Sequence, residues 1–397
     1  MRLSDFVEIN PRTTLPKGSV TEFVPMEAVN PTRRYVRSYP IKKYAGGTKF
    51  INGDTLFARI TPCLENGKIA QFVSTSSEPA FGSTEYWVFR AKAGVSDPGF
   101  VYYLAKSDLI RKPAEKSTVG ASGRQRAQIE AVQDLDVGSV ALEVQQKIAG
   151  TLGAYDDLIE NNTRRIEKLE AMTRLVYRRF FEAPEAENWE ELPIAEILSN
   201  HIGGGWGSDK RDDNFPEPAF VIRGTDVPPA RSGDISGVPF RYHKISNLRS
   251  RALVQGDIIF EVSGGSKGQP LGRSMLVTKE LLNRFDEPVM CASFCKRVSP
   301  NSELLVPEIL YLSFLDAYEN GEIETYSVQS TGISNFKWTE YINRVTRKIP
   351  PYELQKDFQA KVAPMFSQIT ILGKKNGILR HTRDLLLPRL MSGEVKA

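Results

Sequence analysis

The chain of 397 residues is poor in the residues on which disulfide, redox and metal chemistry depend. Its three cysteines, Cys63, Cys291 and Cys295, are too few for a disulfide framework, and this scarcity predicts a cytoplasmic protein. No run of about eighteen apolar residues occurs, so no transmembrane helix is predicted. The first residues, MRLSDFVEINPR, lack the apolar stretch of a secretory signal peptide.

Motifs for catalysis and cofactor binding are also missing. The stretch SGGSKGQPLG (263–272) is rich in glycine, but it lacks the Gly-x4-Gly-Lys-Ser/Thr spacing of a phosphate-binding loop. It is equally compatible with a hairpin tip and with a flexible, lysine-bearing loop that faces a ligand. Cys291 and Cys295 lie in an apolar segment, which predicts buried thiols rather than a metal site. The histidines are scattered, at His201, His243 and His381. We therefore expect no catalytic residue, no cofactor and no metal.

The net charge of +4 hides an uneven distribution along the chain. Residues 1–140 carry 19 basic and 14 acidic side chains, whereas residues 183–350 carry 18 and 23. The mild basic excess of the first part suits a polyanionic partner such as nucleic acid. The acidic excess of the second part means that its overall charge gives no such argument.

Two stretches of the chain carry mostly apolar residues at alternating steps of four and three. The first contains Ile148, Leu152, Tyr155, Ile159, Asn162, Ile166, Leu169, Thr173, Val176 and Phe180. The second follows at an offset of 210 and contains Phe358, Val362, Met365, Ile369, Leu372, Asn376, Leu379, Arg383, Leu386 and Leu390. This spacing averages about 3.5 residues per turn and is typical of a coiled-coil seam. We expect two long helices, the first from about Leu142 to Phe181, that pair with each other in antiparallel fashion.

Each stretch has one asparagine on the seam, Asn162 in the first and Asn376 in the second. A seam asparagine weakens packing but fixes the alignment of the helices. The alternative is a pair of unrelated amphipathic helices, each facing its own globular core. Further apolar residues widen both faces, so we expect a third surface to pack on them: Leu158, Met172, Leu175, Tyr177, Phe181, Phe366, Ile371, Leu385, Leu387 and Met391.

The globular parts of the chain also repeat. INGDTLFARITPCLENGKIAQF (51–72) parallels VQGDIIFEVSGGSKGQPLGRSMLV (254–277), and the loop STVGASGRQR (117–126) parallels QSTGISNFKW (329–338). Short strands with turns dominate these parts, and residues 100–116 predict one helix. We therefore expect an α+β fold. Its tandem domains of short strands and helices lie at 1–140 and 184–350, separated and followed by long helices at 141–183 and 351–397.

A duplication that keeps its frame and changes its loops predicts two binding heads for a ligand with an approximate dyad. Duplex DNA is such a ligand, and different loops would bind different half-site sequences. The order of motifs carries a more specific resemblance. The GDTLFARI and GDIIFEVS strands, the STVGASGRQ and STGISNF loops, the QQKIAGTL helix and the TRDLLLPRLMSGEV ending resemble the specificity subunit of a type I restriction-modification system.

The resemblance covers nearly the whole chain and implies a division of labour. Each target-recognition domain would read one half of a bipartite DNA site, while the paired helices would set the spacing and dock two methyltransferase subunits. Translocase-endonuclease subunits would join the assembly, and the chain itself would perform no chemistry. The sequence supports the last point independently, because it lacks the Asn/Asp-Pro-Pro-aromatic turn of an adenine methyltransferase. The nearest strings, at Asp97-Pro98-Gly99 and Asn30-Pro31-Thr32, lack the second proline and the aromatic residue.

Loop residues with hydrogen-bond donors are the candidates for DNA contact. Arg and Lys suit guanine, Asn and Gln suit adenine, and any donor can bind phosphate. In the first domain the candidates are Arg33, Arg34, Arg59, Thr61, Lys68, Ser122, Arg124 and Gln125. In the second they are Trp206, Lys210, Arg211, Ser266, Lys267, Gln269, Arg273, Ser334, Asn335 and Lys337. The clusters after Gly120 and Gly332 rank highest because they recur at matched positions, although any single basic residue is also compatible with a solvated surface charge.

Two alternative functions remain compatible with the sequence. The chain could read DNA for another phage-defence methylation system, which neighbouring genes would distinguish. It could also be a coiled-coil scaffold that does not bind DNA, an interpretation that the acidic balance of the second domain favours and the repeated loop clusters oppose.

Overall fold

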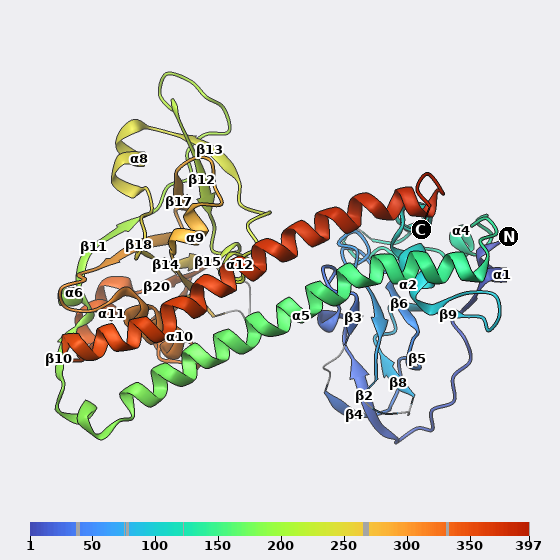
Figure 1. Cartoon of the computed structure of the whole chain (residues 1–397), viewed down its shortest axis with the longest axis horizontal. Coiled ribbons are helices and arrows are strands. Elements are labelled where there is room, and N and C mark those ends of the chain that lie inside the picture. Colours follow the sequence, from blue (N-terminus) through green and yellow to red (C-terminus); the bar gives the residue numbers. More distant parts are fainter. Residues whose placement is uncertain are drawn as a thin grey trace. The chain divides into compact units, whose positions relative to one another are not determined.

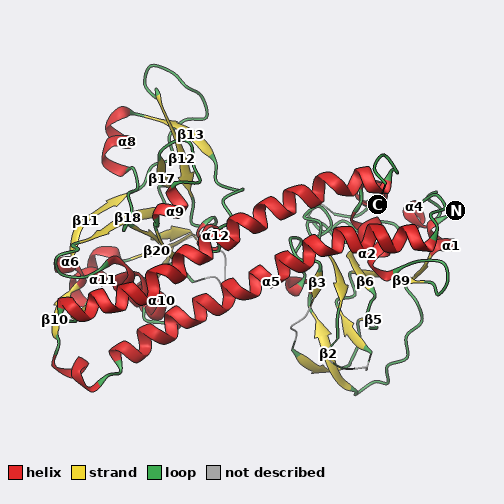
Figure 2. Ribbon diagram, in the orientation of Figure 1, coloured by secondary structure: helices red, strands yellow, loops and turns green. Residues whose placement is uncertain are grey.

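The structure of the chain is a computed structural model, and it describes residues 1–36, 40–74, 76, 79–121, 123–264, 270–330 and 333–396. The chain divides into two compact units. Unit 1 is Met1–Asn161 with Ile378–Ala397, and unit 2 is Asn162–Gly377. Small sheets and helices alternate in both, which confirms the expected α+β class (Figures 1 and 2). None of the helices in the described part of the chain combines the length and apolarity needed to cross a bilayer.

The described residues of unit 1 form two small sheets. One has, in order, β1 (Val7–Ile9), β9 (Tyr86–Ala91), β6 (Thr55–Ala58), β7 (Ile69–Phe72) and β3 (Tyr35–Val36). The other has, in order, β4 (Ile41–Lys43), β2 (Val20–Val24), β8 (Ala80–Gly82) and β5 (Thr48–Phe50). Strand β6 lies between antiparallel neighbours at the centre of the first sheet, and all four of its residues are buried.

The helices of unit 1 are short apart from the long helices treated below. They are α1 (Leu3–Phe6), the 3-10 helix η1 (Met26–Ala28), α2 (Pro98–Lys106), α3 (Asp108–Lys116) and α4 (Glu130–Gln133). Residues 100–116 are helical as predicted on both sides of Ser107, but the chain becomes extended at Ser107, so the segment forms two helices rather than one. The hydroxyl of Ser107 donates to the carbonyl of Leu104 at 2.6 Å, a local bond that competes with continued helix.

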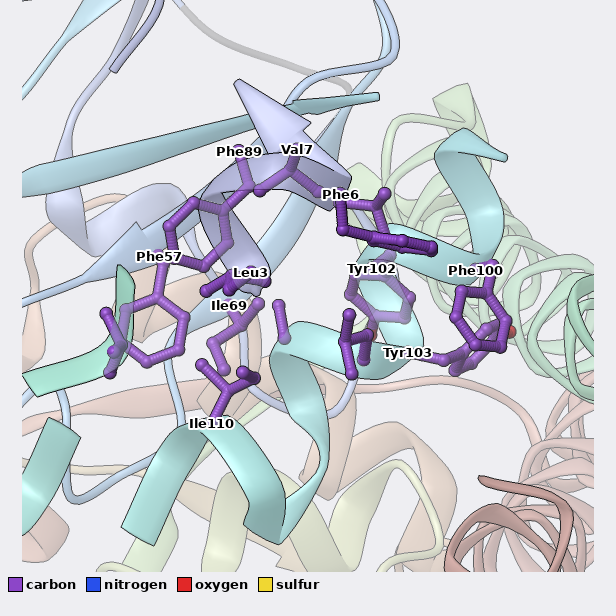
Figure 3. Close-up of a cluster of buried hydrophobic side chains, with 14 of the residues drawn as sticks. Leu3, Phe6, Val7, Phe57, Ile69, Phe89, Phe100, Tyr102, Tyr103 and Ile110 are labelled. Carbon is purple, nitrogen blue, oxygen red and sulfur yellow. The ribbon is translucent and has the colours of Figure 1, made fainter. Parts of the chain in front are cut away.

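Helix α2 supplies much of the apolar core of unit 1. Phe100, Tyr102 and Tyr103 from α2 are buried together with Phe57 and Phe89 from the sheet (Figure 3). The rings of Phe57 and Phe89 lie 5.6 Å apart between centroids. This core fixes the orientation of β6, whose carboxyl end leads into Arg59 and Thr61, two of the residues predicted to contact DNA.

In the part of unit 2 that the structure describes, the strands form four small sheets. The largest has, in order, β11 (Leu198–Gly203), β18 (Cys295–Pro300), β14 (Ile258–Glu261) and β16 (Ser274–Leu276). A second has β13 (Phe240–His243), β12 (Glu217–Ile222) and β17 (Val289–Cys291). A third has β15 (Ser263–Gly264), β20 (Ile333–Phe336) and β19 (Ser327–Ser330), and β10 (Glu190–Pro193) pairs with β21 (Thr346–Ile349).

Two segments of unit 2 that lack a strong strand pattern in the sequence are strands. His201–Gly203 belongs to β11 and pairs with β18, so the glycine-rich loop begins only at Gly204. Residues 327–330 and 333–336 pair as β19 and β20. In both cases a neighbouring strand satisfies the backbone hydrogen bonds of a sequence that has little strand propensity of its own.

The helices of unit 2 surround a second apolar core. They are η2 (Pro184–Asn188), α6 (Ile194–Ile197), α7 (Val227–Arg231), α8 (Ile245–Arg251), α9 (Lys279–Leu282), α10 (Pro307–Glu319), η3 (Ile323–Tyr326) and α11 (Trp338–Arg344). Phe260 of β14 packs with Phe314 of α10 and Tyr341 of α11 inside this core. Helix α10 therefore packs against β14 in unit 2 as α2 packs against β6 in unit 1.

The Gly-Asp turns before β6 and β14 have the same hydrogen-bonded frame. Asp54 accepts from the backbone N–H of Ile51 at 2.8 Å and pairs with Arg90, while Asp257 accepts from the N–H of Val254 at 2.7 Å and pairs with Arg297. Both carboxylates are almost fully buried. The predicted repeat is therefore also a repeat of structure.

The two long helices are α5 (Leu142–Phe181) and α12 (Tyr352–Met391), and α5 has the predicted bounds. In unit 2, Asn162 Nδ2 donates to Asn376 Oδ1 at 2.9 Å, so the two seam asparagines pair with each other. Ile166 lies in one buried cluster with Ile369 and Leu372. Residue numbers rise on α5 as they fall on α12, which confirms the antiparallel pairing.

The predicted seam positions differ in what covers them. Eight are buried: Ile148, Leu152, Ile159, Ile166, Phe358, Val362, Ile369 and Leu372. Five are partly exposed: Tyr155, Leu169, Val176, Leu379 and Leu386. Ile148 and Leu152 belong to the core of unit 1, and Phe358 and Val362 belong to that of unit 2. The heptad pattern thus serves packing against the globular units as well as helix pairing.

A buried glutamine fastens the start of each long helix to its unit. Gln145 accepts from the N–H of Asp97 at 2.9 Å and donates to the carbonyls of Val95 and Val140. Its counterpart 210 residues later, Gln355, makes the same three bonds, with the N–H of Val306 and the carbonyls of Leu304 and Pro350. Each side-chain amide thus satisfies three backbone groups, one N–H and two carbonyls, that come from two different segments of the chain.

Replacing Gln145 with alanine should lower the free energy of unfolding of unit 1 by about 2–3 kcal/mol, because it leaves buried backbone groups without partners. Gln355→Ala should have a similar effect on unit 2. Protection of backbone amides against hydrogen exchange, followed in urea, assigns the loss to one unit. The exposed neighbour Gln146 provides the matched control, and Gln146→Ala should leave protection unchanged. If Gln145→Ala and Gln146→Ala lost the same amount of protection, this role for Gln145 would be contradicted.

Candidate nucleic-acid interface

Two groups of predicted contacts in unit 1 meet just after the carboxyl end of β6. One contains Arg59 and Thr61, and the other contains Arg124 and Gln125. The N–H of Thr61 donates to the carbonyl of Gln125 at 2.9 Å, and the N–H of Gln125 donates to the Thr61 hydroxyl at 2.9 Å. Arg124 is exposed beside this bridge, and Arg59 precedes it. Residues far apart in the sequence are thus brought together on one face of unit 1.

A carboxylate lies at the centre of this face. Glu85 accepts from Arg59 Nε at 3.2 Å and from Arg126 Nη2 at 2.7 Å. Hydrogen bonding from Arg126 lowers the pKa of Glu85, against a smaller opposing effect of burial. The carboxylate therefore stays ionised and orients two guanidinium groups. Neither Glu85 nor Arg126 was among the predicted contacts.

The face of unit 2 is built on the same backbone frame. The N–H of Phe336 donates to the carbonyl of Val262 at 2.8 Å, and the N–H of Ala127 makes the corresponding bond to Arg59 in unit 1. Ser263 pairs with Asn335 across β15 and β20, and its hydroxyl donates to Asn335 Oδ1 at 2.8 Å. The predicted recurrence of the two clusters is thus a recurrence of backbone geometry.

The same backbone frame places Glu85 of unit 1 and Phe294 of unit 2 at equivalent positions, although one side chain is charged and the other is apolar. The N–H of Arg59 donates to the carbonyl of Glu85 at 3.0 Å, and the N–H of Val262 donates to the carbonyl of Phe294 at 2.9 Å. Both acceptors lie in the turn between two strands, β8 and β9 in unit 1 and β17 and β18 in unit 2. Unit 1 therefore presents a carboxylate with two arginines where unit 2 presents an exposed phenylalanine.

Trp206 and Arg273 also reach the face of unit 2, and both are held by neighbours. The guanidinium of Arg241 lies 4.3 Å from the Trp206 ring centroid, and its Nε donates to the Trp206 carbonyl at 3.0 Å. Arg273 pairs with Glu261, whose side chain is 2% exposed. Trp206 and Arg273 line one recess together with Phe294.

Arg33 and Arg34 are directed away from this interface, toward α5. Arg33 pairs with Glu160 at 3.1 Å. Arg34 lies so close to two glycines that a Cβ on Gly99 or Gly153 would come within 2.8 Å of its guanidinium. Burial opposes its charge, but the oxygens of Tyr103, Tyr35 and Asp156 raise the pKa of Arg34 overall. These contacts attach unit 1 to the long helix, and we do not propose that Arg34 binds DNA.

The other predicted residues have mixed surroundings. Lys68 donates from Nζ to the carbonyl of Met26 at 2.9 Å. Lys210 and Arg211 are exposed, and Lys337 lies 3.4 Å from Glu340. Ser334 is half-buried in β20. Four residues lie outside the described part of the chain: Ser122, Ser266, Lys267 and Gln269.

Titratable groups elsewhere do not converge on a reactive centre. Within the described residues, no three His, Cys, Asp or Glu side chains gather where a metal ion could bind. His243 is fully buried, and burial lowers its pKa before the smaller effect of Arg241. Burial raises the pKa of Cys291 to about 12, so this thiol stays protonated. The arrangement can bind and position a ligand, and it offers polar donors in unit 1 and an aromatic recess in unit 2.

Sequence comparison relates this chain to one family. The family model for the type I restriction modification DNA specificity domain matches residues 1–171. The specificity subunit of type I restriction enzyme MjaIX from Methanocaldococcus jannaschii is 25% identical over 312 residues, covering 75% of this chain and 69% of that protein. The HindI specificity subunit from Haemophilus influenzae is 22% identical, with 86% of each chain covered.

Structural comparison agrees at the level of the fold. The crystal structure of a type I restriction-modification S subunit from M. genitalium matches with a TM-score of 0.54 and 16% identity. The match covers 98% of this chain and 95% of that one. Residues 1–171 thus match the type I restriction modification DNA specificity domain, and over most of its length the chain is similar to type I restriction enzyme specificity subunits.

Proposed function

We propose that this chain is the DNA-recognition subunit of a type I restriction-modification complex, and that each unit reads one half of a bipartite site. The observation that carries the proposal is the duplicated face. One backbone frame recurs at the carboxyl ends of β6 and β14, but Glu85 in one copy is replaced by Phe294 in the other. A conserved frame with exchanged side chains suits two heads that bind the same polymer at different sequences.

The long helices supply the second part of the proposal. Large apolar side chains remain exposed on both, notably Leu158, Met172, Leu175, Ile371, Ile378 and Leu385. Exposed apolar residues along paired helices suit a protein partner. We assign them to two methyltransferase subunits, and the helix pair would fix the spacing between the half-sites. Translocase-endonuclease subunits would complete the assembly, which would act in the cytoplasm.

Sequence-resolved mapping of DNA methylation tests the proposal. The chain is expressed with its neighbouring methyltransferase gene, and genomic DNA is compared with that of a strain lacking the chain. A single bipartite motif with a fixed gap, modified on both strands and lost on deletion, is expected. Methylation that persisted unchanged after deletion would exclude the reader role and favour a scaffold or another defence system.

Replacing Arg124 and Gln125 with alanine should weaken binding to one half-site by about tenfold or more, because each lost base or phosphate contact costs about 1–3 kcal/mol. Co-purification with the methyltransferase should not change, since neither residue belongs to the long helices. Fluorescence anisotropy with duplexes altered in one half-site measures the effect. Lys112→Ala, at an exposed site on α3, is the matched control. Unchanged affinity of the double variant would remove this loop from the interface.

A further inference from the structure

The face of unit 2 contains a recess whose walls include two of the predicted DNA contacts, Trp206 and Arg273. Its volume is about 480 Å³, and its walls include Trp206, Gly264, Arg273, Ala292 and Phe294. The side chains of Phe294 and Trp206 are 54% and 39% exposed. Exposed apolar side chains that line one recess indicate a binding site more strongly than apolar residues scattered singly over a surface.

Backbone carbonyls in the segment from Cys291 to Phe294 hold both aromatic residues in place. The carbonyl of Phe294 accepts from the N–H groups of Val262 and Ser263 at 2.9 and 3.2 Å. The loop that carries Trp206 is fastened by the N–H of Gly205, which donates to the carbonyl of Cys291 at 2.9 Å. The preceding Gly204 has no room for a side chain, because a Cβ would come within 2.1 Å of that same carbonyl. The recess is therefore preformed, and a ligand would not have to order it.

The charged residues on its walls are already occupied. Arg273 pairs with the buried carboxylate of Glu261. Arg223 donates to Asp226 at 2.8 Å and to the carbonyl of Gly237 at 2.8 Å. Reading guanine with either arginine would require breaking an ion pair that also neutralises a buried carboxylate. Among the described residues of the recess, the surface left for a ligand is mainly aromatic and aliphatic.

Duplex DNA offers one apolar group to such a surface. In the major groove the bases present hydrogen-bond donors and acceptors, and only thymine adds a methyl group, which proteins contact with side chains such as Phe. Resting on the proposed function, we infer that the recess receives the C5 methyl of a thymine in the half-site read by unit 2, with Phe294 as the specificity-determining residue. The equivalent Glu85 cannot make this contact, so the two units differ in specificity at one defined position.

The experiment uses the full chain in complex with its methyltransferase subunits and duplexes carrying the mapped site. Each thymine of the second half-site is replaced in turn by deoxyuridine, which removes the methyl group alone. One replacement should weaken binding about three- to tenfold, the range expected for losing one buried methyl and part of its packing. Phe294→Ala should weaken binding to the normal site by a similar factor and abolish the difference between thymine and deoxyuridine at that position.

Two further variants control for folding and for general aromatic effects. Phe294→Leu keeps an apolar side chain and should retain part of the discrimination. Phe240→Ala removes an exposed phenylalanine of the same unit that does not line the recess, and it should retain discrimination in full. A second half-site without thymine, insensitivity to every deoxyuridine, or discrimination that survives in Phe294→Ala would overturn the inference. Site-specific binding and methylation in those cases would leave the reader role itself intact.

Discussion

Replacing Asp156 with alanine should lower the free energy of unfolding of unit 1 by about 3–5 kcal/mol, the cost of leaving one member of a buried ion pair without its partner. Asp156 on α5 pairs with Arg383 on α12, and their side chains are 1% and 4% exposed. The hydroxyl of Tyr103 also donates to Asp156 Oδ2 at 2.5 Å. The substitution therefore leaves the guanidinium of Arg383 and the hydroxyl of Tyr103 without the carboxylate that both contact.

The other groups around Arg383 do not compensate for the loss of Asp156. Burial acts to lower the pKa of Arg383, but Asp156 and Asp384 outweigh it and raise the pKa overall, so the side chain stays charged. Asp384 also accepts from Arg383 at 2.8 Å, yet it is 57% exposed and adds a weaker, screened attraction. Nearby Lys106 has its pKa lowered to about 8, first by burial and then by Arg383. A second cation beside Arg383 makes the loss of Asp156 more costly.

Hydrogen exchange of unit 1 amides in increasing urea measures this loss. The double variant Asp156→Ala with Arg383→Met should recover much of the stability, because it removes both charges from the interior. Asp157→Ala changes the exposed neighbouring residue and should have little effect. Equal stability of the single and double variants would show that the pair contributes no coupling.

The same ion pair shows where sequence reasoning succeeds and where it stops. The alternating steps of four and three predicted both helices, their antiparallel pairing and one asparagine on each seam, since helix periodicity is a local property. Arg383 occupies a seam position in that pattern and had no explanation. Its partner Asp156 lies off the seam, and a third contact comes from Tyr103 on α2. Pairing across distant segments cannot be read from spacing in one of them.

The candidate interface divides in the same way. Gln125 was predicted because its cluster repeats in the second copy, and Thr61 was predicted as a loop residue with a donor; the structure brings the two within hydrogen-bond distance. Arg34 was predicted to contact DNA because a basic loop with interleaved tyrosines suits a polyanion, but such a loop also suits a helix surface, which is what Arg34 contacts in the structure. The space that accepts Arg34 is made by glycines on two other helices. Glu85 and Phe294 were missed because the turns STE and ASF share no chemistry, and only the backbone frame aligns them.

Replacing Leu372 with aspartate should destabilise unit 2 by more than about 3 kcal/mol, because it puts an unpaired charge into a buried apolar site. Leu372 is 2% exposed and shares a cluster with Ile166 and Ile369, one turn from the asparagine pair. The helix pair should separate there, and co-purification with the methyltransferase should be lost. Thermal unfolding and co-purification measure the two effects.

The adjacent residue provides a control that separates folding from docking. Ile371 is 38% exposed on the other side of the same helical turn. Ile371→Asp should therefore change stability by less than about 0.5 kcal/mol, as is usual for exposed sites. If the exposed apolar residues of α5 and α12 bind the methyltransferase, this variant should still weaken co-purification while the melting curve stays that of the wild type. If both variants assembled normally, the helix pair would not be the docking surface, and the exposed side chains would need another partner.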